Sequence, residues 1–204
     1  MKLGSLSARY ESNGDPATVS TGFGDAGGVS YGTYQLASNT GSVKRFIDWA
    51  SREGHPAAAI LSRNQPGTSA FSADWVSCAK SYDDFGDLQH NYIKYAYYDP
   101  AVALLRKAHF NIEKHHEVMQ DVVWSRAVQY GTGYIVEMFE DACEAMGYPN
   151  LSYIDAANFD AGLIRAIYLE VCSTEEWTSG SPSLRKGLYA RFANECKDAL
   201  ARLG

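Results

Sequence analysis

The sequence lacks any run of apolar residues long enough to cross a bilayer. Its N-terminal residues, MKLGSLSARYES, contain no apolar stretch of signal-peptide length. It also lacks a cluster of Lys and Arg, and its formal net charge is −6, whereas nucleic-acid binders are usually basic. We therefore expect no nucleic-acid partner and no stable membrane insertion. We expect the chain to act as a monomer.

Cysteine is scarce, with 4 residues in 204, and no CxxC pair or zinc-type spacing occurs. All four lie in segments with helical character, which predicts buried, reduced thiols and a reducing compartment. These residues are Cys78, Cys143, Cys172 and Cys196. His115 and His116 are the remaining metal candidates, but neighbouring helical residues point about 100° apart and do not easily share one ion. We predict no metal and no cofactor.

The residues that are present indicate one globular domain over 1–204 with a large helical lobe. Tyrosine is abundant at 14 residues, and tyrosine rings suit both sugar surfaces and protein cores. A short helix is predicted over 2–12 and a glycine-rich hairpin over 17–37. Further helices are predicted over 42–53, 69–80, 83–97, 101–110, 117–130, 134–146, 155–172 and 183–202. The predicted fold class is α+β, mainly α.

Two carboxylates near the N-terminus could carry glycoside hydrolysis. That reaction needs a protonated acid against apolar side chains and a second carboxylate in a hydrated place. Glu11 fits the first role, because it lies beside Tyr10 at the end of the predicted helix. Asp25 fits the second, because glycines on both sides let the backbone approach a ligand. Alternatively, Glu11 is a solvated helix-end residue and Asp25 a turn residue that binds its own backbone.

A rival for the second carboxylate is Asp15. Asp15 precedes Pro16 just after the predicted N-terminal helix, and an Asp-Pro pair at that place is common turn chemistry. We therefore favour Asp25 for the second role.

In their order along the chain, these segments resemble the lysozyme superfamily. The segment 11–16, ESNGDP, is similar to the ESGG-type start of goose-type lysozymes and lytic transglycosylases, whose Glu is the catalytic acid. The segment 31–36, YGTYQL, is similar to the Y-G-x-x-Q segment in the cleft wall of the same groups. Asp25 and Ser30, with four residues between them, resemble the hairpin of inverting phage lysozymes and bacterial chitosanases. In those enzymes an Asp and a Ser or Thr hold the attacking water.

A further resemblance lies downstream. The segment 122–131, VVWSRAVQYG, is similar to the central helix of phage-encoded endolysins. The resemblance implies a set of substrate-binding residues in the cleft: Tyr31, Tyr34, Gln35, Gln129 and Tyr130. Trp124 is expected in the core.

The resemblance implies a lysozyme-like fold and the function of a phage endolysin. The expected reaction is inverting hydrolysis of the MurNAc-β-1,4-GlcNAc bond of peptidoglycan, with Glu11 as acid, Asp25 as base and Ser30 holding the water. Transglycosylases lack the second carboxylate, which favours hydrolysis. The alternatives are a lytic transglycosylase that uses the same Glu, a chitosanase-like hydrolase, and a non-catalytic lysozyme-fold module of a phage tail or secretion device. Without a signal peptide, the chain is expected in the host bacterial cytoplasm before release onto the wall.

Overall fold

The computed structural model describes residues 3–6, 14–21, 27–173, 177 and 182–204. The chain forms two compact units. We call residues 11–95 the hairpin unit, and residues 1–10 together with 96–204 the helical unit.

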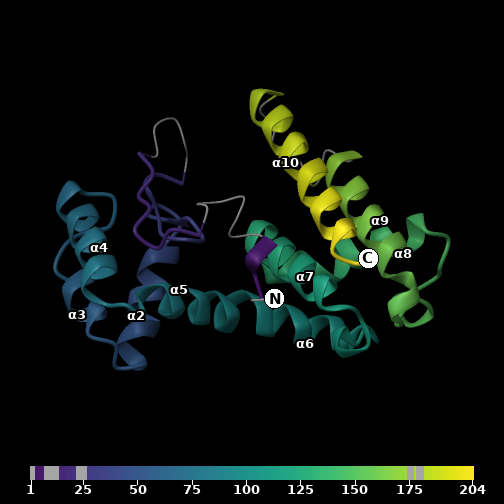
Figure 1. The fold of residues 1–204 in the computed structure, drawn as a ribbon, viewed down its shortest axis with the longest axis horizontal. Helices are drawn as coiled ribbons and strands as arrows, with labels where there is room; N and C mark the ends of the chain where they lie inside the picture. The colour runs from purple at the N-terminus through teal and green to yellow at the C-terminus, as the bar shows by residue number, and fades with distance from the viewer. Residues whose placement is uncertain (1–2, 7–13, 22–26, 174–176, 178–181) are drawn as a thin grey trace. The chain divides into compact units, whose positions relative to one another are not determined.

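The hairpin unit contains a short antiparallel hairpin of β1 (Ser30–Tyr31) and β2 (Leu36–Ala37). Ser30 pairs with Ala37 and Tyr31 with Leu36, and Val19 adds an isolated antiparallel bridge to Tyr31. Helices follow along the chain and pack around the hairpin (Figure 1): α2 (Ser42–Arg52), α3 (Ala57–Leu61), α4 (Ser69–Ser81) and α5 (Phe85–Ile93). The predicted hairpin is thus present, although its paired strands are only two residues long.

Helix α2 shows how the sequence pattern produces a buried face. Val43, Phe46, Ile47 and Ala50 follow the i, i+3, i+4, i+7 spacing of one helical face, and all are buried. Gly54 follows the helix in a left-handed conformation with φ of 74°, which glycine adopts without strain. The predicted helix over 42–53 is confirmed to within one residue.

Aromatic rings fill the core of the hairpin unit. Phe46 of α2 contacts Trp75 of α4 and Phe85 of α5, with ring centroids 5.5 and 6.2 Å apart. Tyr31 of β1 packs against Phe71 and Trp75 of α4. All of these side chains are fully buried, and burying each one contributes roughly 1.5–3 kcal/mol. Packing therefore fixes the hairpin to α4 and to its neighbours.

The π-helical turn η1 (Lys94–Tyr98) crosses the boundary between the two units, which lies between Tyr95 and Ala96. The α-helices of the helical unit are α6 (Asp99–Lys107), α7 (Glu117–Tyr130), α8 (Ile135–Ala145), α9 (Asp160–Ser173) and α10 (Pro182–Ala201). Short 3-10 turns join them: η2 (Ile112–Lys114), η3 (Thr132–Tyr134), η4 (Leu151–Tyr153) and η5 (Ala157–Phe159). Helix α9 packs between α8 and α10 (Figure 1).

Helix α7 carries a fully buried ion pair. Arg126 Nη2 donates to Glu195 Oε2 of α10 at 2.6 Å, and Ser125 Oγ donates to the other carboxylate oxygen. The guanidinium carbon lies 4.9 Å from the ring centroid of Tyr168 and 4.4 Å from that of Phe192. Burial lowers the pKa of Arg126, but Glu195 together with Tyr168, Tyr130 and Cys172 raises it, and the net shift is upward. The contact joins α7, α9 and α10 through charge and ring packing.

The carboxylate of Asp121, on α7, binds residues from near both ends of the chain. Asp121 accepts hydrogen bonds from the Gly4 N–H at 2.6 Å and from Ser5 Oγ at 3.1 Å. Arg202 donates to the same carboxylate at 2.8 Å. Gly4 has φ of +79°, and a Cβ there would lie 2.6 Å from the Trp124 ring. Burial raises the pKa of Asp121, although its hydrogen bonds and Arg202 oppose the rise.

The fold class predicted from the sequence is confirmed, because the described chain is mainly helical with one small antiparallel sheet. The helix predicted over 117–130 coincides with α7. The helix predicted from 155 begins at Asp160 instead, after the turn η5, and the Asp155 and Asp160 carboxylates bind residues of the connection between α6 and α7. Only residues 3–6 of the helix predicted over 2–12 are among the described residues, and residues 5 and 6 are helical.

The four cysteines lie on helices, as predicted, and all are free thiols. Cys78 and Cys143 are buried, whereas Cys172 and Cys196 are half-buried. Burial raises the pKa of the Cys78 thiol to about 11, so it stays protonated at neutral pH. None of the described helices is both long enough and apolar enough to cross a membrane.

Candidate functional site

The loop between β1 and β2 is held from outside the hairpin by α5. Gln89 of α5 accepts from the Thr33 N–H at 2.9 Å through Oε1 and donates to the Pro16 carbonyl at 3.0 Å through Nε2. Trp75 Nε1 donates to the same Pro16 carbonyl at 2.9 Å. Tyr34 Oη lies 3.0 Å from His90 Nδ1, one residue further along α5. The side-chain amide of Gln89 therefore holds the loop at Thr33 and the segment at Pro16 together.

Gly32 leaves the space that Gln89 occupies. Its φ is +76°, and a Cβ built on it would lie 2.3 Å from Gln89 Oε1 and 2.8 Å from the Trp75 ring. Glycine is therefore required both for the backbone conformation and for the close approach of the Gln89 amide. The Gly32 N–H also donates to the Thr18 carbonyl at 2.7 Å, which ties the loop to the segment after Pro16.

Sequence reasoning missed Gln89, and a signal for it exists. The buried side chains of α5 are Phe85, Leu88, Gln89, Tyr92 and Ile93, which follow the spacing of one helical face. A polar side chain inside an apolar stripe must find hydrogen-bond partners when it is buried. Gln89 is only 1% exposed, and its partners are the loop and the Pro16 carbonyl.

Two of the predicted site residues, Ser30 and Tyr31, form strand β1. Ser30 lies in β1, is 8% exposed, and donates its N–H to Ser20 Oγ at 3.1 Å. Tyr31 is fully buried, and its hydroxyl contacts Ser72 Oγ at 3.0 Å and the Gly67 N–H at 3.1 Å. No face of its ring is exposed to a sugar in this structure, so its observed role is to fix the hairpin to α4.

Tyr34 and Gln35 occupy the end of the loop. Tyr34 is 7% exposed, and its ring lies near His90. Gln35 has a positive φ of 48°, and its Nε2 donates to the Gly32 carbonyl at 2.9 Å. Its side chain is half-buried, which leaves part of it open for a ligand. The loop is thus held in place by α5 and by its own hydrogen bond from Gln35 to Gly32.

The two predicted carboxylates, Glu11 and Asp25, lie outside the described residues. The segments that follow them in sequence are described and are bound to each other. The Ser20 N–H donates to the Ser30 carbonyl at 2.9 Å, and the Ser38 N–H donates to the Val29 carbonyl at 2.9 Å. Segments 14–20 and 27–32 therefore belong to one hydrogen-bonded arrangement within the hairpin unit.

Gln129 and Tyr130 lie at the end of α7 in the helical unit. Both are half-buried, and the Tyr130 hydroxyl donates to the Trp177 carbonyl at 3.0 Å. Burial raises the pKa of Tyr130 to about 12, so the hydroxyl keeps its proton and remains a donor at neutral pH. Trp124 is fully buried, as expected for a core residue.

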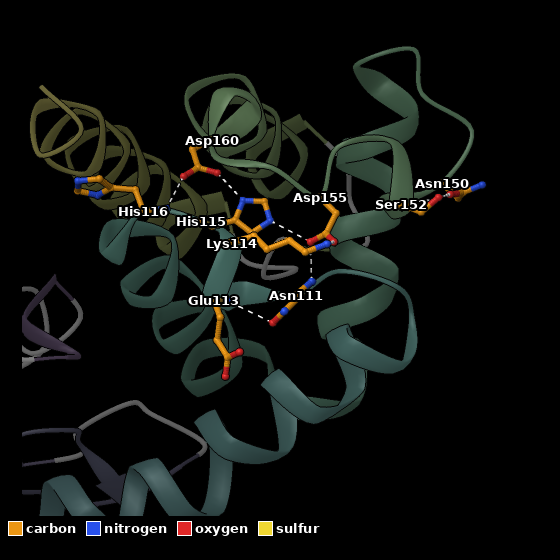
Figure 2. Close-up of polar contacts among 9 residues, drawn as sticks. All are labelled: Asn111, Glu113, Lys114, His115, His116, Asn150, Ser152, Asp155 and Asp160. Atoms are coloured by element: carbon orange, nitrogen blue, oxygen red, sulfur yellow. Dashed lines mark hydrogen bonds and ion pairs between the residues drawn. The ribbon is translucent and has the colours of Figure 1, made fainter.

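The two neighbouring histidines join the connection between α6 and α7 to the connection between α8 and α9 and to the first residue of α9 (Figure 2). The buried His115 ring has Nδ1 2.6 Å from Asp160 Oδ1 and Nε2 3.3 Å from Asp155 Oδ1, and it stacks on Phe110. His116 accepts the Val118 N–H through Nδ1 and so caps α7. Carboxylates occupy both ring nitrogens of His115, so its observed role is structural. Among the described residues, no group of three His, Cys, Asp or Glu side chains could hold a metal ion.

Asp155 is expected to make the stability of the fold depend on acidic pH. Burial raises the pKa of Asp155, but hydrogen bonds from Lys114, the Asn111 N–H and His115 outweigh burial and lower the pKa. A lowered folded pKa means that the carboxylate stabilises the fold above its unfolded pKa of about 4. That contribution is lost as the pH falls through the folded pKa. D155N should therefore unfold at a lower Tm at about pH 7 and lose less stability on acidification to about pH 3.

Asp83 provides the matched control, since it is exposed in the turn before α5. D83N should follow the parent protein in Tm at every pH. Melting curves recorded by circular dichroism across this range would test the prediction. Parallel Tm–pH curves for the parent and D155N would contradict it.

The arrangement of helices and hairpin matches that of a solved chitosanase in a complex structure. The TM-score is 0.58 at 16% sequence identity, and the match covers 95% of this chain and 87% of the chitosanase chain. At this identity the likeness concerns the fold alone. The chain thus has the lysozyme-like fold that the N-terminal motifs imply.

Sequence comparison then gives the family. Residues 3–196 match the model described as type VI secretion system spike protein VgrG3-like, C-terminal, and the chain belongs to this family. The type VI secretion system spike protein VgrG3 of Vibrio cholerae serotype O1 (strain ATCC 39315 / El Tor Inaba N16961) is 37% identical over 131 residues. That match covers 63% of this chain and 12% of the Vibrio protein. The matched family is the C-terminal part of VgrG3-like spike proteins, so the prediction of a phage endolysin is corrected on this point.

Proposed function

We propose that this chain is the peptidoglycan-cleaving module of a type VI secretion spike. It hydrolyses the MurNAc-β-1,4-GlcNAc bond of the glycan strands, and secretion brings it to the cell wall. Family membership supports the link to a secretion spike, and the fold shared with a chitosanase supports glycoside chemistry. The single catalytic domain over 1–204 that the sequence predicts is part of the same proposal.

The observation that carries the proposal is the pairing of the segments that follow the two carboxylates. Glu11 lies three residues before Gly14, and Asp25 lies two residues before Gly27. Segments 14–20 and 27–32, which follow the two predicted carboxylates in sequence, are hydrogen-bonded to each other within the hairpin unit.

The proposed mechanism uses an acid, a base and a water. Glu11 protonates the bridging oxygen of the glycosidic bond as that bond breaks. Asp25 takes a proton from a water that attacks the anomeric carbon, and Ser30 orients that water. In an inverting enzyme the two carboxyl groups stand about 6.5–9.5 Å apart, which leaves room for the water. The product would then have the opposite anomeric configuration to the substrate.

Analysis of digestion products tests the reaction directly. We expect purified peptidoglycan treated with the chain to release fragments with free reducing ends, identified by mass spectrometry. NMR recorded soon after cleavage should show the α-anomer, because a β-linked bond is broken with inversion. A β-anomer would indicate retention, and 1,6-anhydro ends would indicate a lytic transglycosylase. Either product would remove Asp25 from the role of base.

A non-catalytic role in the secretion spike is the second candidate, and the family match favours it as much as it favours an enzyme. Such a module would bind peptidoglycan without cutting it. Sedimentation of the chain with insoluble sacculi, without release of reducing ends from them, would support this second candidate over hydrolysis.

A further inference from the structure

The end of α7 presents an exposed tyrosine beside the predicted substrate-binding pair Gln129 and Tyr130. Tyr134 lies in the turn η3, and its side chain is 55% exposed. Large rings of this kind are usually buried, and an exposed ring on a rigid support suits a ligand with one apolar face. The pyranose ring of a sugar has such a face.

The Tyr134 ring is supported by a buried tryptophan. Trp177 is 4% exposed and meets Tyr134 edge-on, with ring centroids 6.0 Å apart and an interplanar angle of 86°. Tyr130 meets the same indole at 5.6 Å and 85°, and its hydroxyl donates to the Trp177 carbonyl. The two tyrosines therefore share one support, and edge-to-face contacts of this kind contribute about 0.5–1.5 kcal/mol each.

The glycines between the two tyrosines keep the approach to Tyr134 open. Gly131 has φ of 88° and ψ of 154°, a conformation that is almost confined to glycine. A Cβ added at Gly131 or at Gly133 would meet no atom within 4 Å. The described structure therefore leaves open space at both glycines next to the half-exposed Tyr134 side chain.

We propose that Tyr134 is a sugar-stacking residue that binds an N-acetylhexosamine ring of the glycan strand, with Trp177 holding its ring in place. This inference rests on the proposed function. Stacking does not change during bond breaking, so Tyr134 contributes to binding of the substrate and of the transition state equally. Its loss should therefore raise KM and leave kcat nearly unchanged.

The binding experiment uses the full chain carrying Glu11→Gln, so that the ligand is not consumed. The probe is soluble chitohexaose, a β-1,4 oligomer of N-acetylglucosamine, titrated by calorimetry. Adding Tyr134→Ala should weaken binding by about tenfold, whereas Tyr134→Trp should retain it because the ring is kept. Kinetics on solubilised glycan strands, without the Glu11 change, should show the same factor in KM.

Tyr153 offers a matched control in the same unit. It is 60% exposed in η4, and the described structure records no aromatic contact for its ring. Tyr153→Ala should leave chitohexaose binding and KM unchanged. If Tyr134→Ala binds the oligomer as well as the parent does, or if Tyr153→Ala weakens binding equally, the assignment of Tyr134 is wrong. Neither result would touch the proposed function, which fails if the parent chain releases no reducing ends from peptidoglycan.

Discussion

Replacing Glu11 with Gln is expected to leave the fold intact and to lower peptidoglycan cleavage by roughly a hundredfold to ten-thousandfold. The amide has nearly the same size as the carboxyl group but cannot donate the proton that the leaving oxygen requires. The rate is measured as the loss of turbidity of a sacculus suspension, with reducing-end release as a second readout. Near-normal clearing by E11Q would contradict the role of Glu11 as the general acid.

Asp15 supplies the matched control for this experiment. It lies four residues after Glu11, and its Oδ1 accepts the Ala17 N–H at 2.8 Å in an exposed turn. D15N preserves that acceptor, so the turn and the cleavage rate should both be retained. A loss in D15N as large as that in E11Q would show that the rate responds to charge near the N-terminus rather than to one acid.

Glu195→Gln is expected to lower the free energy of unfolding by about 3–5 kcal/mol. The substitution leaves the Arg126 guanidinium buried without a neutralising carboxylate, and the side chains of both partners are 0% exposed. Such a charge is costly to keep away from water even though aromatic rings surround it. Urea denaturation followed by circular dichroism measures the change.

The exposed pair Lys44–Asp48 gives a sharp comparison, because its N–O distance of 2.6 Å equals that of the buried pair. Its side chains are 74% and 56% exposed. D48N should cost less than about 0.5 kcal/mol, since water already screens the charges. Equal losses in D48N and E195Q would contradict the view that burial, rather than geometry, sets the cost.

Helix positions were predictable where the pattern of apolar residues is periodic. Val43, Phe46, Ile47 and Ala50 placed α2, and the apolar run from 117 to 130 placed α7. Start points that depend on tertiary hydrogen bonds were not predictable from the pattern. The Asp160 carboxylate binds the His116 N–H and His115, which lie 44 and 45 residues earlier, and no local pattern contains that information.

The carboxylates, Ser30 and the loop segment stay predictions that rest on the resemblance of their order along the chain to a known superfamily. The contacts that hold the loop in place could not be predicted from the sequence. The brace by Gln89 depends on a contact 56 residues away in sequence, which a single sequence does not reveal. Tyr31 was assigned to sugar binding because of the resemblance of its segment, and the sequence does not reveal that its side chain is completely buried.

The Asp121 carboxylate brings residues near the two ends of the chain to one point. Gly4, Ser5 and Arg202 all bind it, so these segments meet within hydrogen-bonding distance of a single side chain. Closely spaced ends are the condition under which a circular permutant tolerates a short peptide joining them. New ends could then be opened in an exposed loop, such as the one that contains Gly147. The whole chain could in this way be displayed from another scaffold through ends that lie away from Asp121.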